Sequence, residues 1–257
     1  LLTARSVRSH RFSFCPVEDQ PVSLTDYYLW FETGDSMSDV ELTQVREAHK
    51  FDEAALTRYM QAHVEEFNGP LTIKQFEGGQ SNPTFQLITP SRTYVMRKQP
   101  PGELLPSAHQ VDREYKVMAA LWNTPVPVPK MYCLCEDVSI IGTKFYIMEM
   151  VEGRLFTETR LPSCSQRERS AIYLDLARVL AELHNVDPVT VGLSEFGRPG
   201  NYYERQIGRW SKQYIASKTE EIDAMDRLME WLPQNIPADA GSVIVHGDYR
   251  LGNVLIH

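Results

Sequence analysis

The chain has 257 residues, of which 42% are hydrophobic and 23% are charged, and its formal net charge is -8 with a pI of about 5.4. This length allows a substantial core, in one large domain or in two lobes, and the composition is that of an ordinary globular protein. The acidic balance argues against nucleic acid or an anionic membrane as the main partner, and no apolar run approaches the length of a membrane span.

The first fifty residues predict a poorly ordered extension outside the fold. Arginines among Ser and Leu are compatible with a targeting segment, but Leu1 is not a start residue and Met37 is the natural one, so the segment before Met37 is interpreted as an upstream extension or a misread frame. The aromatic run from Tyr27 to Phe31 resembles a short strand or helix, but nothing nearby pairs with it. We therefore expect the fold to begin at residue 51.

A helix followed by three strands is predicted from residue 51 onward. Apolar and aromatic side chains recur at helical spacing between Phe51 and Phe67, and Asn68-Gly69-Pro70 ends that helix. Alternating side chains then predict strands at residues 71–77, 84–89 and 93–98.

The turn between the first two strands combines two glycines with small polar residues, namely Gly78, Gly79, Ser81 and Asn82. Because no bulky side chain blocks the approach, the backbone N–H groups of such a turn can cover phosphates. The same composition also suits a turn that only reverses the chain. The turn therefore indicates phosphate binding only in combination with its position in the chain, before the strand that ends in two cations.

Two neighbouring cations, Arg97 and Lys98, end the third strand. Successive side chains of a strand point to opposite faces, so only one of the two can face a given ligand. The alternative is that both are solvated charges at a strand end. A helix predicted at residues 111–122 carries Glu114 near its start, where its carboxylate either pairs with the strand cation or lies exposed.

Two further strands, at residues 131–137 and 144–151, complete a predicted five-stranded antiparallel sheet. The second of them runs through Glu149 and Met150 to Gly153, which we take as the hinge before a second lobe.

The cysteines do not form a recognisable metal site. Cys133 and Cys135 alternate along one predicted strand, and no second cysteine or histidine pair completes a zinc site. They are interpreted as reduced structural thiols of a cytoplasmic protein.

From Gly153 onward the pattern is mainly helical. Ser165 and Glu168 form a capping box, and the helix that they open ends before Asp187-Pro188. Further helices are predicted at residues 202–217 and 220–231.

The most informative stretch runs from Val243 to His257. Two short β-branched runs, at residues 243–245 and 254–256, predict strands on either side of a loop that contains Asp248 and Asn253. A phosphotransferase needs this pair, since the carboxylate can accept the proton of an attacking hydroxyl and the amide oxygen can help to hold Mg²⁺. A lone His-Gly-Asp is usually an ordinary corner after a strand, but the spacing to Asn253 favours the functional interpretation.

The loop sequence H-G-D-Y-R-L-G-N resembles the catalytic loop of the aminoglycoside phosphotransferase-like (kinase-like) superfamily. The resemblance extends over residues 51–257. Three segments are most similar to the branch related to the kinase domain fused to some acyl-CoA dehydrogenases: R-K-Q-P-P-G-E-L at 97–104, D-R-E-Y at 112–115 and G-R-P-G-N-Y-Y-E-R-Q at 197–206.

This resemblance implies an α+β, protein-kinase-like fold of two lobes. Residues 51–152 would form the nucleotide-binding N-lobe, a five-stranded antiparallel sheet plus a helix. Residues 153–257 would form a mainly helical C-lobe, incomplete after the catalytic loop. In the family a second metal-binding aspartate follows in a D-W-E-like motif, and the chain reaches His257 before any such residue.

The resemblance also implies roles for individual residues, with ATP and Mg²⁺ as cofactors. Asp248 would be the catalytic base and Asn253 a metal ligand. Arg97 is favoured over Lys98 as the cation on the phosphates, held by Glu114. The family's phosphate-covering turn matches Gly78, Gly79, Ser81 and Asn82, and its adenine-binding linker matches Glu149 and Met150.

The implied activity is transfer of phosphate from ATP to the hydroxyl of a small molecule, with a hydroxylated acyl-CoA as one such acceptor. The alternative is an inactive, pseudokinase-like module that binds nucleotide or acyl-CoA, because the second metal aspartate is absent from these residues. Neither interpretation predicts a nucleic-acid or membrane partner, and the sequence leaves the oligomeric state open.

Overall fold

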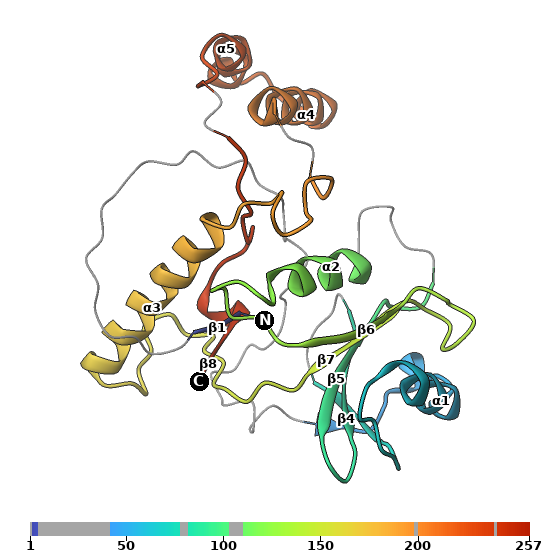
Figure 1. Ribbon diagram of the computed structural model, residues 1–257. Helices are drawn as coiled ribbons and strands as arrows, with labels where there is room; N and C mark the ends of the chain where they lie inside the picture. Colours follow the sequence, from blue (N-terminus) through green and yellow to red (C-terminus); the bar gives the residue numbers. More distant parts are fainter. Residues whose placement is uncertain (1, 5–41, 78–81, 103–109, 198–199, 239–240) are drawn as a thin grey trace.

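The computed structural model describes residues 2–4, 42–77, 82–102, 110–197, 200–238 and 241–257 (Figure 1). Its main feature is a six-stranded antiparallel sheet with the strand order β2-β3-β4-β5-β7-β6. In that order the strands are Leu42–Thr43, Thr72–Phe76, Thr84–Ile88, Thr93–Lys98, Phe145–Glu149 and Met131–Cys135.

Strand β5 lies in the middle of the sheet, and its alternating side chains are buried on both faces of the sheet. Tyr94 and Met96 are buried in the cluster on the side of α1 (Glu53–His63), whereas Val95 is buried in the cluster on the side of α2 (Val111–Leu121). This alternation is the consequence of the two-residue repeat of a strand. The five strands predicted for this sheet and the two helices predicted between residues 51 and 122 are present, with ends that differ by a few residues.

Helix α2 connects the sheet with the helical part of the chain. Val111 and Met118 pack with the sheet, while Val117 and Leu121 belong to the core that also contains the buried side chains of α3 (Gln166–His184). Figure 1 accordingly shows α2 between the sheet and α3. A helix that is packed on two sides has little freedom to move, so any group that α2 carries is well fixed.

The boundary predicted at residue 51 is wrong, because residues just before it belong to the fold. Leu42 and Thr43 of β2 pair with Phe76 and Gln75 of β3, and this makes the sheet six-stranded rather than five-stranded. The buried side chain of Gln75 fixes the segment, since its amide oxygen accepts the Arg46 N–H at 3.0 Å.

Further toward the N-terminus, β1 (Leu2–Ala4) pairs in parallel with β8 (Val254–Ile256). The aromatic run at 27–31 and Met37 lie outside the described residues.

Helix α3 begins where its capping box predicts. The Ser165 hydroxyl accepts the Glu168 N–H at 3.2 Å, and the helix buries Ile172, Val179 and Leu183 in the core. This cap satisfies one of the N–H groups that the first turn of any helix leaves without a partner inside the helix.

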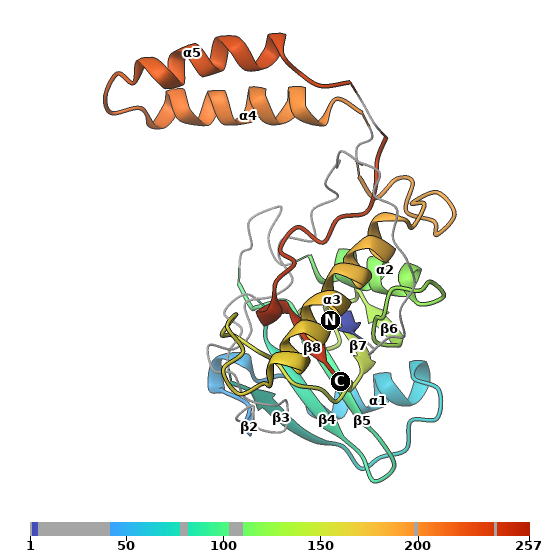
Figure 2. The same ribbon diagram turned by 90° about the vertical axis from the view of Figure 1, so that its left-hand side faces the viewer.

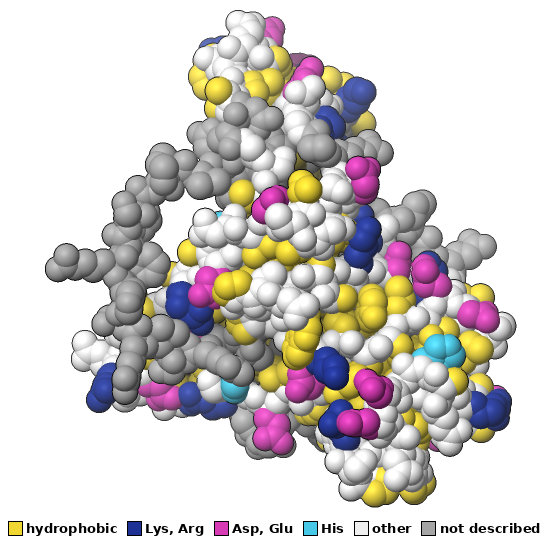
Figure 3. All heavy atoms as spheres, in the orientation of Figure 1, with side chains coloured by type: hydrophobic (Ala, Val, Ile, Leu, Met, Phe, Trp, Pro, Cys, Tyr) yellow, Lys and Arg dark blue, Asp and Glu magenta, His cyan; other side chains and the backbone are white. Residues whose placement is uncertain are grey.

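Helices α4 (Tyr202–Ser217) and α5 (Asp223–Trp231) form a hairpin that projects away from the rest of the molecule (Figure 2). Neither helix contains a buried residue, and large side chains such as Trp210 and Trp231 are more than half exposed. In Figure 3 hydrophobic side chains are visible on this hairpin, while charges of both signs are interspersed over the face shown.

The strand predicted at residues 243–245 is wrong. Ile244 and Val245 are buried, but no strand of the described residues pairs with them. The strand preference of β-branched residues reflects how well their side chains pack on a half-buried surface. Here Ile244 packs in the core that contains α3, although its backbone pairs with no strand of the described residues. No helix among the described residues is long and apolar enough to cross a membrane.

The strand after the loop, β8, is tied to the linker that leaves the sheet. The Arg154 N–H donates to the Ile256 carbonyl at 2.7 Å, and the Ile256 N–H donates to the Arg154 carbonyl at 2.9 Å. Gly153 makes this approach possible, because a Cβ there would lie 3.1 Å from the Ile256 carbonyl oxygen. The linker and the end of the loop are therefore one hydrogen-bonded unit.

Candidate active site

The loop brings the predicted carboxylate and carboxamide together. Gly247 has a φ of 82°, a conformation that an L side chain rarely adopts, and it turns the chain from His246 to Asp248. The fully buried Asn253 donates from Nδ2 to the Asp248 carbonyl at 2.8 Å and to Asp248 Oδ2 at 2.7 Å. One amide therefore holds both the backbone and the carboxylate of Asp248.

The other atom of this amide, Asn253 Oδ1, is suited to a cation. It is buried, and no hydrogen bond reaches it from the described residues. A buried polar atom without a partner is costly, and a hard cation such as Mg²⁺ prefers oxygen ligands of this kind. No group of three His, Cys, Asp or Glu residues in the described part of the chain could hold a metal by itself.

His246, to which the sequence interpretation gave no role, shapes the turn. Its side chain is 2% exposed, and its Nδ1 accepts the Asp248 N–H at 3.3 Å. Burial lowers the pKa of His246 to about 4, so the ring is neutral at pH 7 and can act as an acceptor. The motif H-G-D was the available signal, since an acceptor two residues before the aspartate can close this turn.

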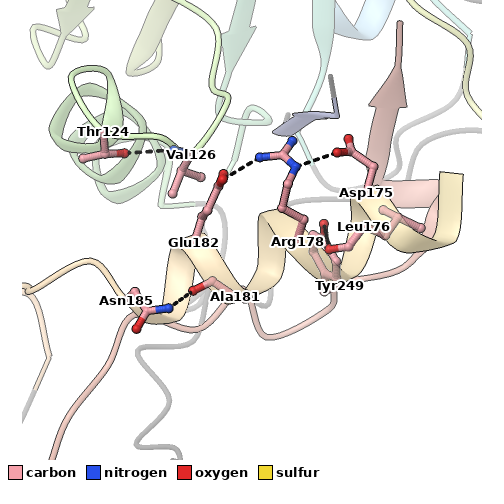
Figure 4. Close-up of polar contacts among 9 residues, drawn as sticks. All are labelled: Thr124, Val126, Asp175, Leu176, Arg178, Ala181, Glu182, Asn185 and Tyr249. Carbon is pink, nitrogen blue, oxygen red and sulfur yellow. Dashed lines mark hydrogen bonds and ion pairs between the residues drawn. The ribbon is translucent and has the colours of Figure 1, made fainter. Parts of the chain in front are cut away.

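Tyr249 anchors the loop to α3 (Figure 4). Its hydroxyl donates to the Leu176 carbonyl at 2.9 Å, and burial raises the pKa of this phenol. The same stretch of α3 is braced by Arg178, whose guanidinium contacts Asp175 Oδ1 and Glu182 Oε1, each at 2.6 Å. The residue beside Asp248 is thus fixed to a rigid helix, a tertiary contact that no local pattern predicts.

The second polar group lies on the sheet, where Arg97 of β5 meets Glu114 of α2. Arg97 Nε is 3.0 Å from Glu114 Oε2, and the two side chains are 6% and 2% exposed. Asn82 donates to Glu114 Oε1 at 2.9 Å and Tyr146 donates to Oε2 at 2.8 Å. Burial raises the pKa of Glu114, and these three partners oppose the rise.

Lys98 lies on the opposite face of the strand. It is 2% exposed, and its Nζ lies 5.9 Å from the centroid of the Phe51 ring. Burial lowers the pKa of this ammonium group. The interpretation of both cations as solvated strand-end charges is therefore wrong, because both are buried, and of the two it is Arg97 that pairs with Glu114.

The remaining predicted residues are distributed differently from the expectation. Gly78, Gly79 and Ser81 lie outside the described residues. Asn82 is fully buried and serves the Glu114 carboxylate. Because the two residues are 32 positions apart, no local sequence pattern predicts this contact.

Glu149 and Met150 occupy the start of the linker. The Glu149 carboxylate accepts the Lys130 N–H at 3.1 Å, so this side chain joins β7 to the segment before β6. Met150 packs against the cluster of Val95 and Tyr146 on the α2 side of the sheet. Met150 thus lies on the face of the sheet that carries the Arg97–Glu114 pair, whereas Glu149 stands opposite Tyr94 in the ladder, on the α1 side.

Comparison with known proteins gives a family. Residues 72–257 match the family described as "Phosphotransferase enzyme family". The crystal structure of a "putative aminoglycoside phosphotransferase" from Ralstonia eutropha JMP134 is similar with a TM-score of 0.72 and 54% identity, over 81% of this chain and 61% of that one.

Two curated relatives are acyl-CoA dehydrogenases by name. The chain is 47% identical over 240 residues to "Probable acyl-CoA dehydrogenase IBR3" of Arabidopsis thaliana, and 44% identical over 230 residues to "Acyl-CoA dehydrogenase family member 11" of Homo sapiens. These matches cover 87% and 88% of this chain, and the chain spans 29% of the length of each relative.

The matched family region contains both polar groups of the site, the Arg97–Glu114 pair and the Asp248–Asn253 loop. It covers more than half of the chain. The chain therefore belongs to the phosphotransferase enzyme family and has its kinase-like fold.

Proposed function

We propose that this chain is the part of a kinase-like enzyme that transfers the γ-phosphoryl group of ATP to the hydroxyl of a small molecule. The observation that carries the proposal is the double role of Asn253, whose Nδ2 holds the Asp248 carboxylate at 2.7 Å while its buried Oδ1 has no hydrogen-bond partner among the described residues. A base and a metal-binding oxygen at one point are what phosphoryl transfer requires.

In the proposed reaction Asp248 accepts the proton of the acceptor hydroxyl, whose oxygen bonds to the γ-phosphorus. The bond from that phosphorus to the β–γ bridging oxygen breaks, and its electron pair leaves with ADP. Asp248 suits the base, because its side chain is 39% exposed and so accessible to an acceptor. Mg²⁺ bound through Asn253 Oδ1 would supply positive charge to neutralise the phosphates.

On the sheet, we assign the phosphate-binding cation to Arg97 rather than Lys98. Glu114 supports this assignment, because its carboxylate pairs with Arg97 and is itself held by hydrogen bonds from Asn82 and Tyr146, so the direction of the guanidinium is fixed. The turn with Gly78, Gly79 and Ser81 would cover the phosphates, and Asn82 would act through Glu114. The linker at Glu149 and Met150 would receive the adenine.

For the acceptor we propose a hydroxylated acyl-CoA. The support is the similarity to two relatives named acyl-CoA dehydrogenases, which extends over 87% and 88% of this chain. We also place the protein in the cytoplasm, in keeping with Cys133, Cys135 and Cys164 as free, buried thiols.

The test is Mg²⁺-dependent ADP formation by the full chain, with hydroxylated acyl-CoAs and with the same acyl-CoAs lacking the hydroxyl. We expect ADP and a phosphorylated product only with the hydroxylated set, and a loss of about a hundred- to ten-thousand-fold in turnover for Asp248→Asn. Asp137→Asn is the matched control, since Asp137 is an exposed aspartate of a loop and its substitute can still accept the Ser139 N–H.

Two outcomes would overturn the proposal. If Asp248→Asn turned over as fast as the wild type, Asp248 would not be the base. If the chain bound Mg·ATP but formed no ADP with any hydroxyl acceptor, the nucleotide-binding module would be the correct alternative.

A further inference from the structure

Lys98 is a buried cation that the proposed reaction does not use. It is 2% exposed and follows the fully buried Tyr94 and Met96 on the α1 side of β5. Among the described residues no hydrogen bond or ion pair reaches its ammonium group, and the Phe51 ring at 5.9 Å lies at the outer limit of a cation–π contact. An ammonium group that is buried without an anion is costly, whereas methionine or leucine would continue the apolar row. Packing therefore does not explain a lysine at this position.

The segment between β2 and α1 lies over this corner of the sheet. Its Phe51 ring contacts Lys98 and meets the Phe85 ring edge-on, with 5.3 Å between the two ring centroids. The short helix η1 (Glu47–His49) contains no buried residue, and Phe51 and His49 are only half-buried. A small ion that approaches Lys98 from this side thus meets one thin layer of chain rather than the core.

Gln75 fixes the position of the proton on His49 in this segment. The amide oxygen of the buried Gln75 side chain accepts the Arg46 N–H at 3.0 Å, so its NH₂ group is the part that lies 2.8 Å from His49 Nδ1 and donates to it. An imidazole nitrogen that accepts a hydrogen bond carries no proton, so the neutral ring has its proton on Nε2. No acceptor for this N–H is present among the described residues. His49 therefore offers a hydrogen-bond donor at its outer edge.

The charges near His49 are positive. Burial lowers the pKa of His49, the Gln75 hydrogen bond opposes this change, and the charges of Lys98 and Arg46 lower the pKa further. Glu77 contacts Arg46 at 3.7 Å, but no carboxylate of the described residues forms an ion pair with Lys98 or His49. This corner of the sheet therefore combines a buried positive charge with a free donor and has no matching negative charge.

We propose that Lys98 and His49 bind a small oxyanion of the phosphate class on the α1 side of the sheet, behind the face that carries the Arg97–Glu114 pair. The ammonium group supplies a compact positive charge, and His49 Nε2–H supplies a second donor. A phosphate group, which carries about −1.5 to −2 charges near pH 7, gains more from a positive site than a carboxylate does. The inference does not rest on the proposed function, since the phosphates of ATP are assigned to the opposite face.

The experiment titrates inorganic phosphate, and separately acetate, into the full chain at constant ionic strength. Calorimetry and the rise in the urea midpoint both measure binding. For Lys98→Met we expect at least about tenfold weaker phosphate binding, because a charge-assisted hydrogen bond is lost. Acetate should bind the wild type at least about tenfold more weakly than phosphate does. Lys50→Met is the matched control and should bind phosphate like the wild type, since Lys50 follows His49 but is 61% exposed and pairs with Glu47 at 2.6 Å.

His49→Phe keeps the test decisive if Lys98→Met does not unfold cooperatively. It removes the Nε2–H from a half-buried position and should weaken phosphate binding at least about threefold. Equal phosphate binding by the wild type and by both variants would overturn the site, because the anion would then bind elsewhere. The absence of phosphate binding to the wild type would overturn it as well. Equal affinities for acetate and phosphate would overturn the assignment to the phosphate class.

Discussion

Glu114 and Arg97 form an ion pair that is almost completely removed from water, with 2% and 6% of the side chains exposed and 3.0 Å between Oε2 and Nε. The pair joins β5 to α2, and α2 also packs against the helical core. The Arg97–Glu114 pair, which we assign to phosphate binding, thus also connects β5 with α2, and its loss should affect both stability and activity.

Glu114→Gln tests the contribution of this buried ion pair to stability. It leaves the Arg97 charge buried without its carboxylate, and breaking one side of a buried pair costs about 3–5 kcal/mol. Urea unfolding should therefore show a large loss of free energy. Glu168→Gln is the matched control, because the Arg154–Glu168 pair is closer at 2.6 Å but 45% and 37% exposed, and such water-screened pairs contribute little to stability. Equal losses for the two variants would contradict the distinction.

Arg97→Met and Lys98→Met separate two neighbouring cations on opposite faces of β5. We expect Arg97→Met to weaken Mg·ATP binding at least tenfold, since it removes the phosphate-binding charge. Lys98→Met should bind Mg·ATP normally and unfold at equal or higher urea concentration, because burial already lowers the pKa of that ammonium group. Isothermal titration with Mg·ATP measures the first effect. Weaker nucleotide binding in Lys98→Met alone would reverse the assignment.

His246 should make the protein sensitive to acid. Its pKa in the folded state is lowered from 6.5 to about 4, so between these values the unfolded state binds the proton more strongly. Stability is then complete above about pH 6.5 and falls as the pH decreases toward 4. This single group would account for about 3 kcal/mol at 1.36 kcal/mol per pKa unit. Unfolding at pH 7, 5 and 4 measures it, and His246→Gln should show a flatter dependence between pH 7 and 4.

Tyr249→Phe removes the hydroxyl that anchors the loop to α3 (Figure 4). We expect a loss of about 1 kcal/mol in unfolding free energy, the usual value of one hydrogen bond. Turnover should fall more than Mg·ATP affinity, because the loop carries Asp248. Tyr173→Phe is the control on the same helix, since its hydroxyl donates to the Thr159 carbonyl far along the chain from the loop. A similar change in turnover for both variants would argue against an anchoring role.

Local signals in the sequence predicted the regular elements well. The helix expected at residues 202–217 has these limits in the structure, and Ser165 caps α3 as its spacing to Glu168 predicts. Caps and periodicity are encoded within one element, so they can be read from sequence. The two-residue strand β2 could not be, because it depends on pairing with β3 about thirty residues away.

The polar contacts of the candidate site were less accessible to sequence reasoning. Alternation along β5 predicts that Arg97 and Lys98 face opposite sides, but only the position of α2 decides which side holds Glu114. The contact from Asn82 to Glu114 spans 32 residues and has no local signature. For Asp248 and Asn253 the spacing itself carried the information, because both belong to one loop.

The two hydrogen bonds between Arg154 and Ile256 make the linker and β8 a single unit. Their amide protons can exchange with solvent only when this unit separates, so both should exchange at a common rate set by one opening event. A nucleotide that binds at the linker and holds it closed would slow exchange at Ile256 as well as at Arg154, although Ile256 need not touch the nucleotide. Nucleotide bound at the linker would thus reduce local opening at Ile256, which follows the catalytic loop.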